Sequence, residues 1–506
     1  MIPGILAIDI GTSSCKAAVF SLKGDMLALG KGRYSLLFPK EGYAEQKPDE
    51  IYQGVCEAVC HLERQGIELS EIQAISFSAQ IAAQCLVDSR GKAVTNLISW
   101  MDMRAWDEAL EFTQKFSKEE TEYLTGVDMV VTPAYSIAKL RWLHNHERGL
   151  LEMAARFVQI KDYVIYHLTG CWVSDAASLK GLVHAETGKA VPEIMTFIGE
   201  SPELLPKVKK PYEIAGYLKK GVRGFEQLPA GIPVIVGWND MNAAFLGMGA
   251  LTGSCIGMDL TGTSEHLGCV TLRKRIEQKA YEGLNRVPFL DGREVFYGVT
   301  SSGGQAVEWF VKDMLGEPDV KAYFERLFER PKGLPLAEEQ GPIFLPYLEG
   351  ERNPWNNRDA RGVFFGLNRS HRQPELALSV LEGVCFALRT IYDRLPQLPE
   401  KVVISGGASF NEVWNQMKAD VMNVPFVRLE TSEAGCTGAA ILAIAALHPK
   451  KTVEELAGGL FRPAKVYWPD QKRHLIYEKK YQSFLRLYHN LEPLFGKQQC
   501  HNEEEL

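Results

Sequence analysis

One short motif constrains the fold of this chain more than any other feature. Residues 5–20 read ILAIDIGTSSCKAAVF. The apolar residues 5–8 predict a buried strand that ends at Asp9, residues 11–13 (Gly-Thr-Ser) turn the chain, and residues 15–20 return as a second strand. Hydroxyls and backbone N–H groups in such a turn suit a phosphate, and a carboxylate beside them suits a hydrated Mg²⁺. An ordinary hairpin whose acid faces solvent is the alternative interpretation.

The same motif occurs a second time about half a chain later. Residues 255–270, CIGMDLTGTSEHLGCV, again bring an apolar strand to Asp259, then to the turn residues Gly262, Thr263 and Ser264, and then into a return strand. Two such turns predict two similar α/β domains that face each other across a cleft. In that architecture ATP lies between the two hairpins.

With these motifs the chain resembles the FGGY family of carbohydrate kinases, within the ribonuclease H-like ATPase folds of actin, hexokinase and Hsp70. Residues 345–367, which contain PYLEGERNPWNN and GVFFGL, are most similar to the xylulokinase-like members. The resemblance runs from about residue 4 to about residue 447. It implies an N-terminal domain over 1–247, a C-terminal domain over 248–463, and a C-terminal helix with a polar tail over 464–506.

Composition agrees with a cytoplasmic enzyme and excludes several other classes of protein. The 506 residues fit two large domains, and 46% hydrophobic with 24% charged residues is ordinary for a soluble globular protein. A net charge of −7 argues against nucleic acid or an anionic membrane as a partner. No apolar run reaches membrane-spanning length, and a signal peptide is not expected. The ten cysteines are scattered without metal-site spacing, which predicts reduced thiols.

A second stretch with chemical potential ends at Asp240. Residues 233–240, PVIVGWND, predict a buried strand, a glycine turn and the start of a helix. A helix N-terminus stabilises a carboxylate as the anion, which is the form that a general base needs. By resemblance, Asp240 is the catalytic base that takes the proton from the sugar hydroxyl. A plain aspartate at a helix start is the alternative.

The resemblance also implies a site for ATP and Mg²⁺. Asp9 would hold Mg²⁺, chiefly through waters. Lys16 stands seven positions after Asp9, where the family carries a Lys or Arg for the γ-phosphate. The residues expected at the nucleotide are Thr12, Ser13, Lys16, Gly262 and Thr263 for the phosphates, Gly304 at a glycine-rich helix start, and Gly407, Ala408 and Asn411 for the adenosine. For residues 402–409, a simple strand–turn–helix joint is the alternative.

The acceptor site is expected in the N-terminal domain. Gln80 matches the family's sugar-binding segment, but residues 81–83 are Ile-Ala-Ala where xylulokinases and glycerol kinases carry polar contacts. Asp102 and Arg104 match a Trp-x-Asp-x-Arg motif, and they either contact sugar hydroxyls or pair with each other across the cleft. A helix-start acid and a surface Arg are the alternative. Tyr135 is a weaker candidate for contact with the substrate.

The expected function is ATP-dependent phosphorylation of a hydroxyl of a small sugar or polyol, with a ketopentose as the first candidate. A kinase for a polyol or a sugar acid is one alternative. A non-catalytic sensor on the same fold is another, motivated by residues 81–83, and an Hsp70-like ATPase is a third. Walker-type, dinucleotide-binding, hydrolase and zinc-protease motifs are absent from the sequence. Since the family is often dimeric, the resemblance also suggests a homodimer.

Overall fold

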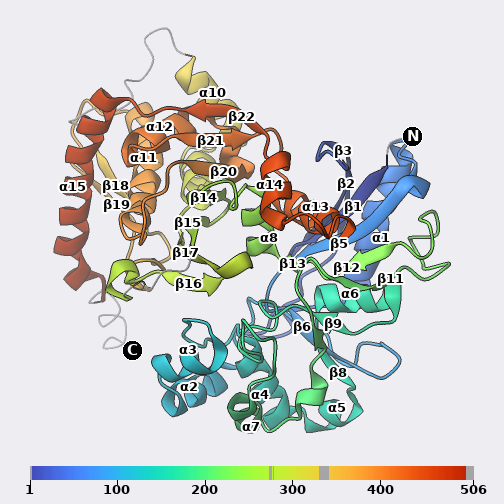
Figure 1. Ribbon diagram of the computed structural model, residues 1–506. Helices are drawn as coiled ribbons and strands as arrows, with labels where there is room; N and C mark the ends of the chain where they lie inside the picture. The colour runs from blue at the N-terminus through green and yellow to red at the C-terminus, as the bar shows by residue number, and fades with distance from the viewer. Residues whose placement is uncertain (1–2, 273–275, 277, 330–340, 497–506) are drawn as a thin grey trace. The chain divides into compact units, whose positions relative to one another are not determined.

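The computed structural model describes residues 3–272, 276, 278–329 and 341–496, and the chain forms two compact units (Figure 1). Unit 1 contains residues 1–252 and 433–461, and unit 2 contains residues 253–432 and 462–506. These units differ from the expected division at 247/248 and 463/464, because the chain returns to unit 1 for two helices before it ends in unit 2. The polar tail expected after Lys497 lies outside the described residues.

Unit 1 is built on a mixed sheet. Its strand order is β11 (Ile214–Tyr217), β12 (Pro233–Ile235), β5 (Ile72–Ala79), β1 (Gly4–Ile10), β2 (Ser14–Ser21) and β3 (Met26–Arg33), and β13 (Trp238–Asn239) also pairs with β5. Strands β1, β2 and β3 form an antiparallel meander, whereas β5 lies parallel to β1. Residues 4–8 are fully buried, so both faces of β1 are covered.

Helices and smaller sheets complete unit 1. The smaller sheets are β4 (Glu45–Gln46), β7 (Leu97–Ile98), β6 (Gln84–Val87) and β8 (Arg156–Gln159), and the pair β9 (Val173–Ser174) and β10 (Lys207–Val208). The helices are α1 (Pro48–Arg64), α2 (Trp106–Lys115), α3 (Lys118–Thr125), α4 (Ser136–His146), α5 (Arg148–Met153), α6 (Ile160–Thr169), α7 (Pro192–Ile198), α8 (Asp240–Gly247), α13 (Ala434–Leu447) and α14 (Val453–Leu460).

Local sequence explains why α1 forms where it does. Pro48 occupies the first helical turn, where its missing N–H has no cost, and Asp49 and Glu50 complement the positive end of the helix dipole. Buried residues such as Ile51 and Val55 recur at helical spacing and face the meander.

Unit 2 repeats the sheet pattern of unit 1. The strand order is β16 (Asn285–Pro288), β17 (Arg293–Thr300), β15 (Glu265–Leu272), β14 (Cys255–Thr261), β20 (Val402–Gly406), β21 (Phe426–Leu429) and β22 (Pro463–Tyr467). β14, β15 and β17 form the antiparallel meander, and β20 lies parallel to β14 as β5 does to β1. The sequence repeat is therefore a structural repeat, as the two motifs predicted.

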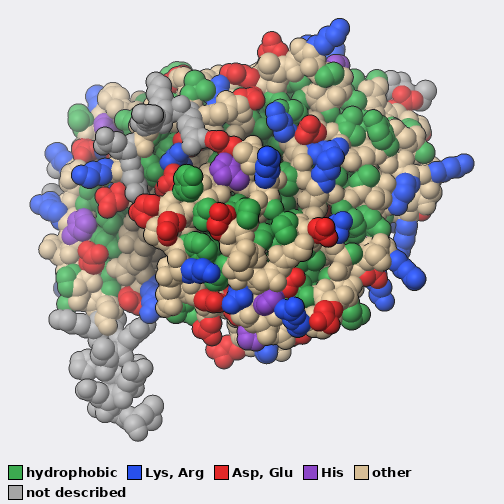
Figure 2. All heavy atoms as spheres, turned by 60° about the horizontal axis from the view of Figure 1, so that its bottom comes forward, with side chains coloured by type: hydrophobic (Ala, Val, Ile, Leu, Met, Phe, Trp, Pro, Cys, Tyr) green, Lys and Arg blue, Asp and Glu red, His purple; other side chains and the backbone are tan. Residues whose placement is uncertain are grey.

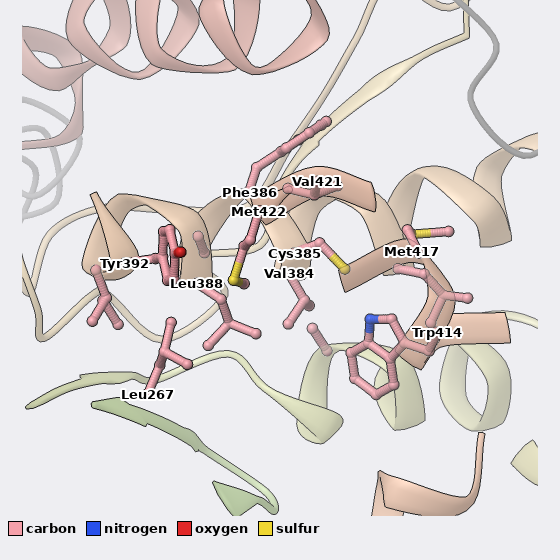
Figure 3. Close-up of a cluster of buried hydrophobic side chains, with 14 of the residues drawn as sticks. Leu267, Val384, Cys385, Phe386, Leu388, Tyr392, Trp414, Met417, Val421 and Met422 are labelled. Carbon is pink, nitrogen blue, oxygen red and sulfur yellow. The ribbon is translucent and has the colours of Figure 1, made fainter. Parts of the chain in front are cut away.

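The remaining elements of unit 2 enclose a large apolar core. They are β18 (Ile343–Leu345), β19 (Val363–Phe365), α9 (Gly304–Glu308), a π-helical turn (Trp309–Met314), α10 (Val320–Phe328), α11 (Gln373–Tyr392), α12 (Glu412–Met422) and α15 (Gln471–Phe495). Figure 3 shows part of this core, in which Leu388 of α11 lies near Leu267 of β15, whereas the ring of Phe386 points away from Leu267 and packs against Phe484 of α15. The residues of α11 from Ala377 onward are almost all buried, because this helix crosses the core.

Within the described ranges, no helix combines the length and the apolar character needed to cross a bilayer. On the face drawn in Figure 2, Lys and Arg side chains are interspersed with Asp and Glu. That mixture is consistent with the negative net charge of −7, which gives the chain no basic surplus.

Candidate active site

The first hairpin turn lies between β1 and β2. The Gly11 N–H donates to the Ser14 carbonyl at 3.0 Å and closes the turn. A Cβ atom on Gly11 would come within 3.1 Å of that carbonyl oxygen, which favours glycine there. The turn is also tied to its surroundings, because Trp100 Nε1 donates to Thr12 Oγ1 at 3.0 Å. Ser13 is exposed and Thr12 is partly exposed, so this turn is open to a ligand.

Asp9 lies at the carboxyl end of β1, next to the turn. Ser78 Oγ donates to Asp9 Oδ1 at 2.6 Å. Burial raises the pKa of Asp9, against the opposing effects of the Ser78 hydrogen bond and the Lys16 charge. The start of α13 lies so close that a Cβ on Gly435 would be 3.1 Å from Asp9 Oδ1. The carboxylate is therefore held from two sides.

Lys16 lies opposite Asp9 in the β1–β2 register. Its Nζ donates to Glu433 Oε2 at 2.5 Å, and Glu433 is the residue that precedes α13. Burial lowers the pKa of Lys16, but the hydrogen bond and charge of Glu433 outweigh this effect and leave the pKa raised. Lys16 is therefore a cation beside Asp9. Sequence reasoning missed Glu433, whose only signal was its position before a helix of small residues.

Asp240 is the first residue of α8, as the sequence predicted. Its Oδ1 accepts the Met241 N–H at 2.8 Å, while Asn239 is the N-cap and accepts the Asn242 N–H. Burial of its carboxyl group raises the pKa of Asp240 to about 7, and the negative charge of Asp9 adds to this shift. Desolvation thus outweighs the helix N-terminus, which was expected to keep this carboxyl well ionised at neutral pH.

Gln80 is buried and connected to the first hairpin turn. Its Nε2 donates to Gln46 Oε1 at 2.9 Å, and Gln46 Nε2 in turn donates to the Thr12 carbonyl at 2.6 Å. The other amide atom, Gln80 Oε1, is buried without a hydrogen-bond partner. A buried acceptor without a donor is costly, so this atom is well suited to accept a hydrogen bond from a ligand hydroxyl.

Asp102 and Arg104 pair with each other. Asp102 is fully buried, and its two carboxylate oxygens accept the Ala44 N–H at 2.7 Å and Arg104 Nε at 2.8 Å. The guanidinium of Arg104 also bonds Glu45 at 2.5 Å and lies 3.8 Å above the ring of Tyr43. Among the interpretations from the sequence, this geometry favours the internal pair over contact with sugar hydroxyls, and the buried guanidinium is not that of a surface arginine.

Lys139 supports the segment that follows Gln80. Its buried Nζ donates to the backbone carbonyls of Ala82 at 2.5 Å and Ser99 at 2.8 Å. Burial lowers the pKa of Lys139 to about 7. Ala82 has a φ of 55°, an uncommon conformation for a residue with a side chain. The lysine therefore fixes the shape of the segment that was expected to read the sugar.

Tyr135 lies beside a second lysine that sequence reasoning missed. Lys180 Nζ is 4.0 Å from the centroid of the Tyr135 ring. The positive charge of Lys180 also acts on Asp240, where it opposes the effect of burial on the pKa. In the sequence, Lys180 appears in a turn between Ser178 and Gly181 without a recognisable motif, which is why it was overlooked.

The second hairpin turn, in unit 2, is held by the start of α9. The N–H of Gly304 donates to the Gly262 carbonyl at 2.9 Å, and the N–H of Gln305 donates to the Thr263 carbonyl at 3.1 Å. A Cβ on Gly304 would be 2.7 Å from the Gly262 oxygen. Gly304 thus supports an exposed turn at Gly262 and Thr263, and its own N–H is already used.

The aspartate of the second hairpin has a different environment from Asp9. Lys418 Nζ is 2.7 Å from Asp259 Oδ2 and also forms an ion pair with Glu265. All three residues are almost completely buried. Burial and the Asp259 charge raise the pKa of Glu265. Asp259 is therefore one member of a buried ion-pair cluster.

A glycine turn follows β20 in unit 2. Gly406 has a φ of 99°, and a Cβ there would be 2.1 Å from the Thr261 carbonyl oxygen, so this position requires glycine. A Cβ on Gly407, in contrast, would meet nothing within 4 Å. The Ala408 N–H donates to Thr261 Oγ1 at 3.0 Å, and the carbonyl oxygen of the Asn411 side chain caps α12. The turn leaves open space at Gly407, where the sequence predicted a flat base.

Comparisons with known proteins agree with this arrangement. The chain is 27% identical to a xylulose kinase of Bacillus subtilis over 497 residues, which cover 96% of each chain. It is also 27% identical to a gluconokinase of Bacillus subtilis over 510 residues, which cover 98% of this chain and 96% of that one. The solved structure of a ligand-bound xylulose kinase from Lactobacillus acidophilus matches with a TM-score of 0.86 at 27% identity, covering 98% of this chain and 99% of that one.

The family patterns cover most of the molecule. The pattern of the N-terminal domain of the FGGY carbohydrate kinases matches residues 4–247, and that of the C-terminal domain matches residues 257–447. The mixed α/β units described above are the fold of these kinases. Both hairpins fall within the matched ranges. The chain therefore belongs to the FGGY family of carbohydrate kinases.

Proposed function

We propose that this carbohydrate kinase transfers the γ-phosphoryl group of ATP to a hydroxyl of a small sugar-like acceptor, with Asp240 as the general base. The observation that carries the proposal is the environment of Asp240, whose pKa is raised to about 7 by burial and by the charge of Asp9. A base is most effective when its pKa lies near the working pH. Asp240 would take the proton of the hydroxyl as its oxygen attacks the phosphorus.

The residues of the first hairpin fit a magnesium nucleotide. Asp9 is a carboxylate at the mouth of a polar turn, and the glycine at 435 leaves room beside it. It would hold Mg²⁺ chiefly through waters, and Thr12, Ser13 and Lys16 would face the phosphates. When bound, MgATP supplies the phosphoryl group and a cation that neutralises its charge. Lys16 would add its own positive charge to that of the metal.

In unit 2, Gly262 and Thr263 present an exposed turn suited to phosphate oxygens. The open space at Gly407 fits a flat adenine base, with Ala408 and Asn411 beside it. Gly304 would act by supporting the turn, since its N–H is bonded to Gly262. Binding of one ATP by residues of both units stays a prediction, as do the cytoplasmic location and the homodimer.

Family membership alone does not assign the acceptor, because relatives of equal identity are named as xylulose kinase and gluconokinase. A ketopentose is the acceptor expected from the sequence, and a sugar acid is the alternative. Gln80 would accept a hydrogen bond from an acceptor hydroxyl through its unpartnered Oε1. Tyr135 would contact the acceptor beside Lys180.

The proposal is tested by replacing Asp240, the proposed general base. Asp240→Asn should lower the rate of phosphoryl transfer by at least ~100-fold, the lower range for loss of a general base. Because Asp240 is not assigned to the nucleotide, ATP binding measured by titration calorimetry should be unchanged. The matched control is Asp107→Asn, which alters an exposed aspartate in the first turn of α2 and should leave the rate within about twofold.

Two results would contradict the proposal. Turnover by Asp240→Asn at the wild-type rate would remove Asp240 from the base role. ATP binding by the wild-type chain without ADP release, across ketoses, aldoses, polyols and sugar acids, would instead favour the nucleotide-binding sensor.

A further inference from the structure

The acceptor segment after Gln80 offers few polar groups. Ile81 is partly buried, Ala82 and Ala83 are buried, and the Ala82 carbonyl is engaged by Lys139. A pocket that distinguishes hydroxyl patterns needs donors and acceptors on its side chains. This segment supplies one such group, Gln80 Oε1. Selectivity for the acceptor must therefore come in part from another element.

The turn that carries Lys180 is firmly anchored. Asp175 Oδ1 accepts the Ser178 N–H at 3.0 Å, and Asp175 Oδ2 is 2.9 Å from the buried Nζ of Lys161. Gln159 Nε2 donates to the Ser178 carbonyl at 2.8 Å. These bonds are inside unit 1 and fix the backbone two residues before Lys180. A cation on such a turn has a defined position, unlike a lysine on a loose surface loop.

The lysine side chain is also positioned at its far end. Its Nζ lies 4.0 Å from the centroid of the Tyr135 ring, within the range of a cation–π contact. Tyr135 is half-buried just before α4. Lys180 and Asp240 are close enough for their charges to interact. Three separate segments thus bring an aromatic ring, an ammonium group and the proposed base into one region of unit 1.

The charges in this region favour an anionic acceptor. Asp9 and Asp240 interact electrostatically, and both would repel a negatively charged molecule. A neutral sugar needs no cation next to the base, whereas an anion needs one to offset that repulsion. An ammonium group placed by an aromatic ring can form a charge-assisted hydrogen bond with a carboxylate.

Resting on the proposed kinase function, we propose that the acceptor is a sugar acid and that Lys180 binds its carboxylate. Gln80 Oε1 then accepts a hydrogen bond from a hydroxyl of the same molecule, and Asp240 takes the proton of the hydroxyl that is phosphorylated. The products are ADP, a phosphorylated sugar acid and the proton released from Asp240. Lys180 acts as a specificity-determining residue.

The experiment compares acceptors in which a carboxylate replaces a neutral hydroxymethyl group at C1. Gluconate and sorbitol share their hydroxyl pattern and differ at C1, as do xylonate and xylitol, and xylulose represents the neutral ketoses. ADP release is measured with each. We expect at least one of the two acids to be phosphorylated with a kcat/KM at least ~10-fold above that of its neutral counterpart, the lower range for a hydrogen bond to a charged group.

Variants at position 180 then test the residue itself. Lys180→Met keeps the apolar stem over Tyr135 and removes the charge, so KM for the acid should rise by about 10- to 100-fold, with kcat within about threefold and no change for sorbitol or xylitol. Lys180→Arg should restore most of the affinity. The matched control is Lys189→Met, an exposed lysine in the same region of the chain, which should leave KM unchanged. Calorimetric titration of the acid into each variant gives the same comparison without turnover.

The outcomes separate the inference from the kinase proposal. Phosphorylation of xylulose or a polyol, with neither acid favoured, overturns the inference and leaves the kinase proposal standing. An equal loss of kcat by Lys180→Met for acid and neutral acceptors also overturns it, because that result indicates a lysine that only tunes Asp240. Absence of ADP release with every acceptor overturns both.

Discussion

The hairpins β1–β2 and β14–β15 have the same fold, but their aspartates have different partners. Each aspartate ends the first strand of a meander beside a parallel fourth strand. Asp9 accepts a hydrogen bond from Ser78 and has Lys16 beside it, whereas Asp259 is buried in an ion pair with Lys418. The comparison teaches that a repeated motif marks a repeated fold, whereas the residues that bond each carboxylate, Ser78 and Lys418, come from outside the motif.

The largest effect is expected in the second hairpin, on stability. Lys418→Met would leave Asp259 and Glu265 buried without their cation, which should lower the free energy of unfolding by about 3–5 kcal/mol. Chemical denaturation measures this change. The control is Lys312→Met, which breaks an exposed pair with Glu308 and should cost less than about 1 kcal/mol. Equal losses of unfolding free energy in Lys418→Met and Lys312→Met would contradict a structural role for Lys418.

In the first hairpin the corresponding effect should fall on activity. Lys16→Met removes a cation that we propose faces the transferred phosphoryl group, so kcat should fall by about 100-fold. Stability should change by less than about 1 kcal/mol, because the pair with Glu433 is partly exposed to solvent. Steady-state kinetics and thermal melting measure the two effects, with Lys23→Met in the exposed turn after β2 as the control. If Lys16→Met instead lowers stability and leaves kcat normal, the lysines of the two hairpins have the same structural role and the expected contrast is wrong.

The smallest effect is expected in the pH dependence of kcat/KM, through Asp240, whose pKa is influenced by Asp9 of the first hairpin. The pKa of Asp240 is raised to about 7, chiefly by burial. The base must be deprotonated to accept a proton, so kcat/KM should fall about tenfold for each pH unit below about 7 and level off above it. The test measures initial rates in buffers of constant ionic strength between about pH 5.5 and 9, a range that spans a pKa of about 7. A profile that stays flat to the acid end would contradict the assignment.

The sequence was sufficient to predict the parts of the molecule that depend on local pattern. Both hairpins, the helix start at Asp240 and the glycine turn near Gly407 follow from short apolar runs and glycines. The partners of the charged residues were not predictable, because Lys418 and Glu433 are more than 150 residues from the carboxylate and the lysine that they contact. Lys180 was missed because it stands in a turn without a recognisable motif.

The balance between opposing electrostatic effects also lay beyond the sequence. The position of Asp240 at a helix start was predicted, and its burial was not. Likewise, Asp102 and Arg104 were recognised as a motif, but only the structure shows that they bond each other and Glu45. Motifs identify which residues matter, whereas burial and long-range contacts decide what each one does.

The membership of α13 in unit 1 has a consequence for how the protein is made. This helix is buried along most of its length and contacts β1, β5 and α8 (Figure 1). A ribosome releases the first 252 residues long before it reaches residue 434, so the nascent first unit waits with an uncovered apolar surface while the second is synthesised. Such a surface is a target for chaperones. Expression of residues 1–252 alone is therefore a poor route to a smaller version of this enzyme.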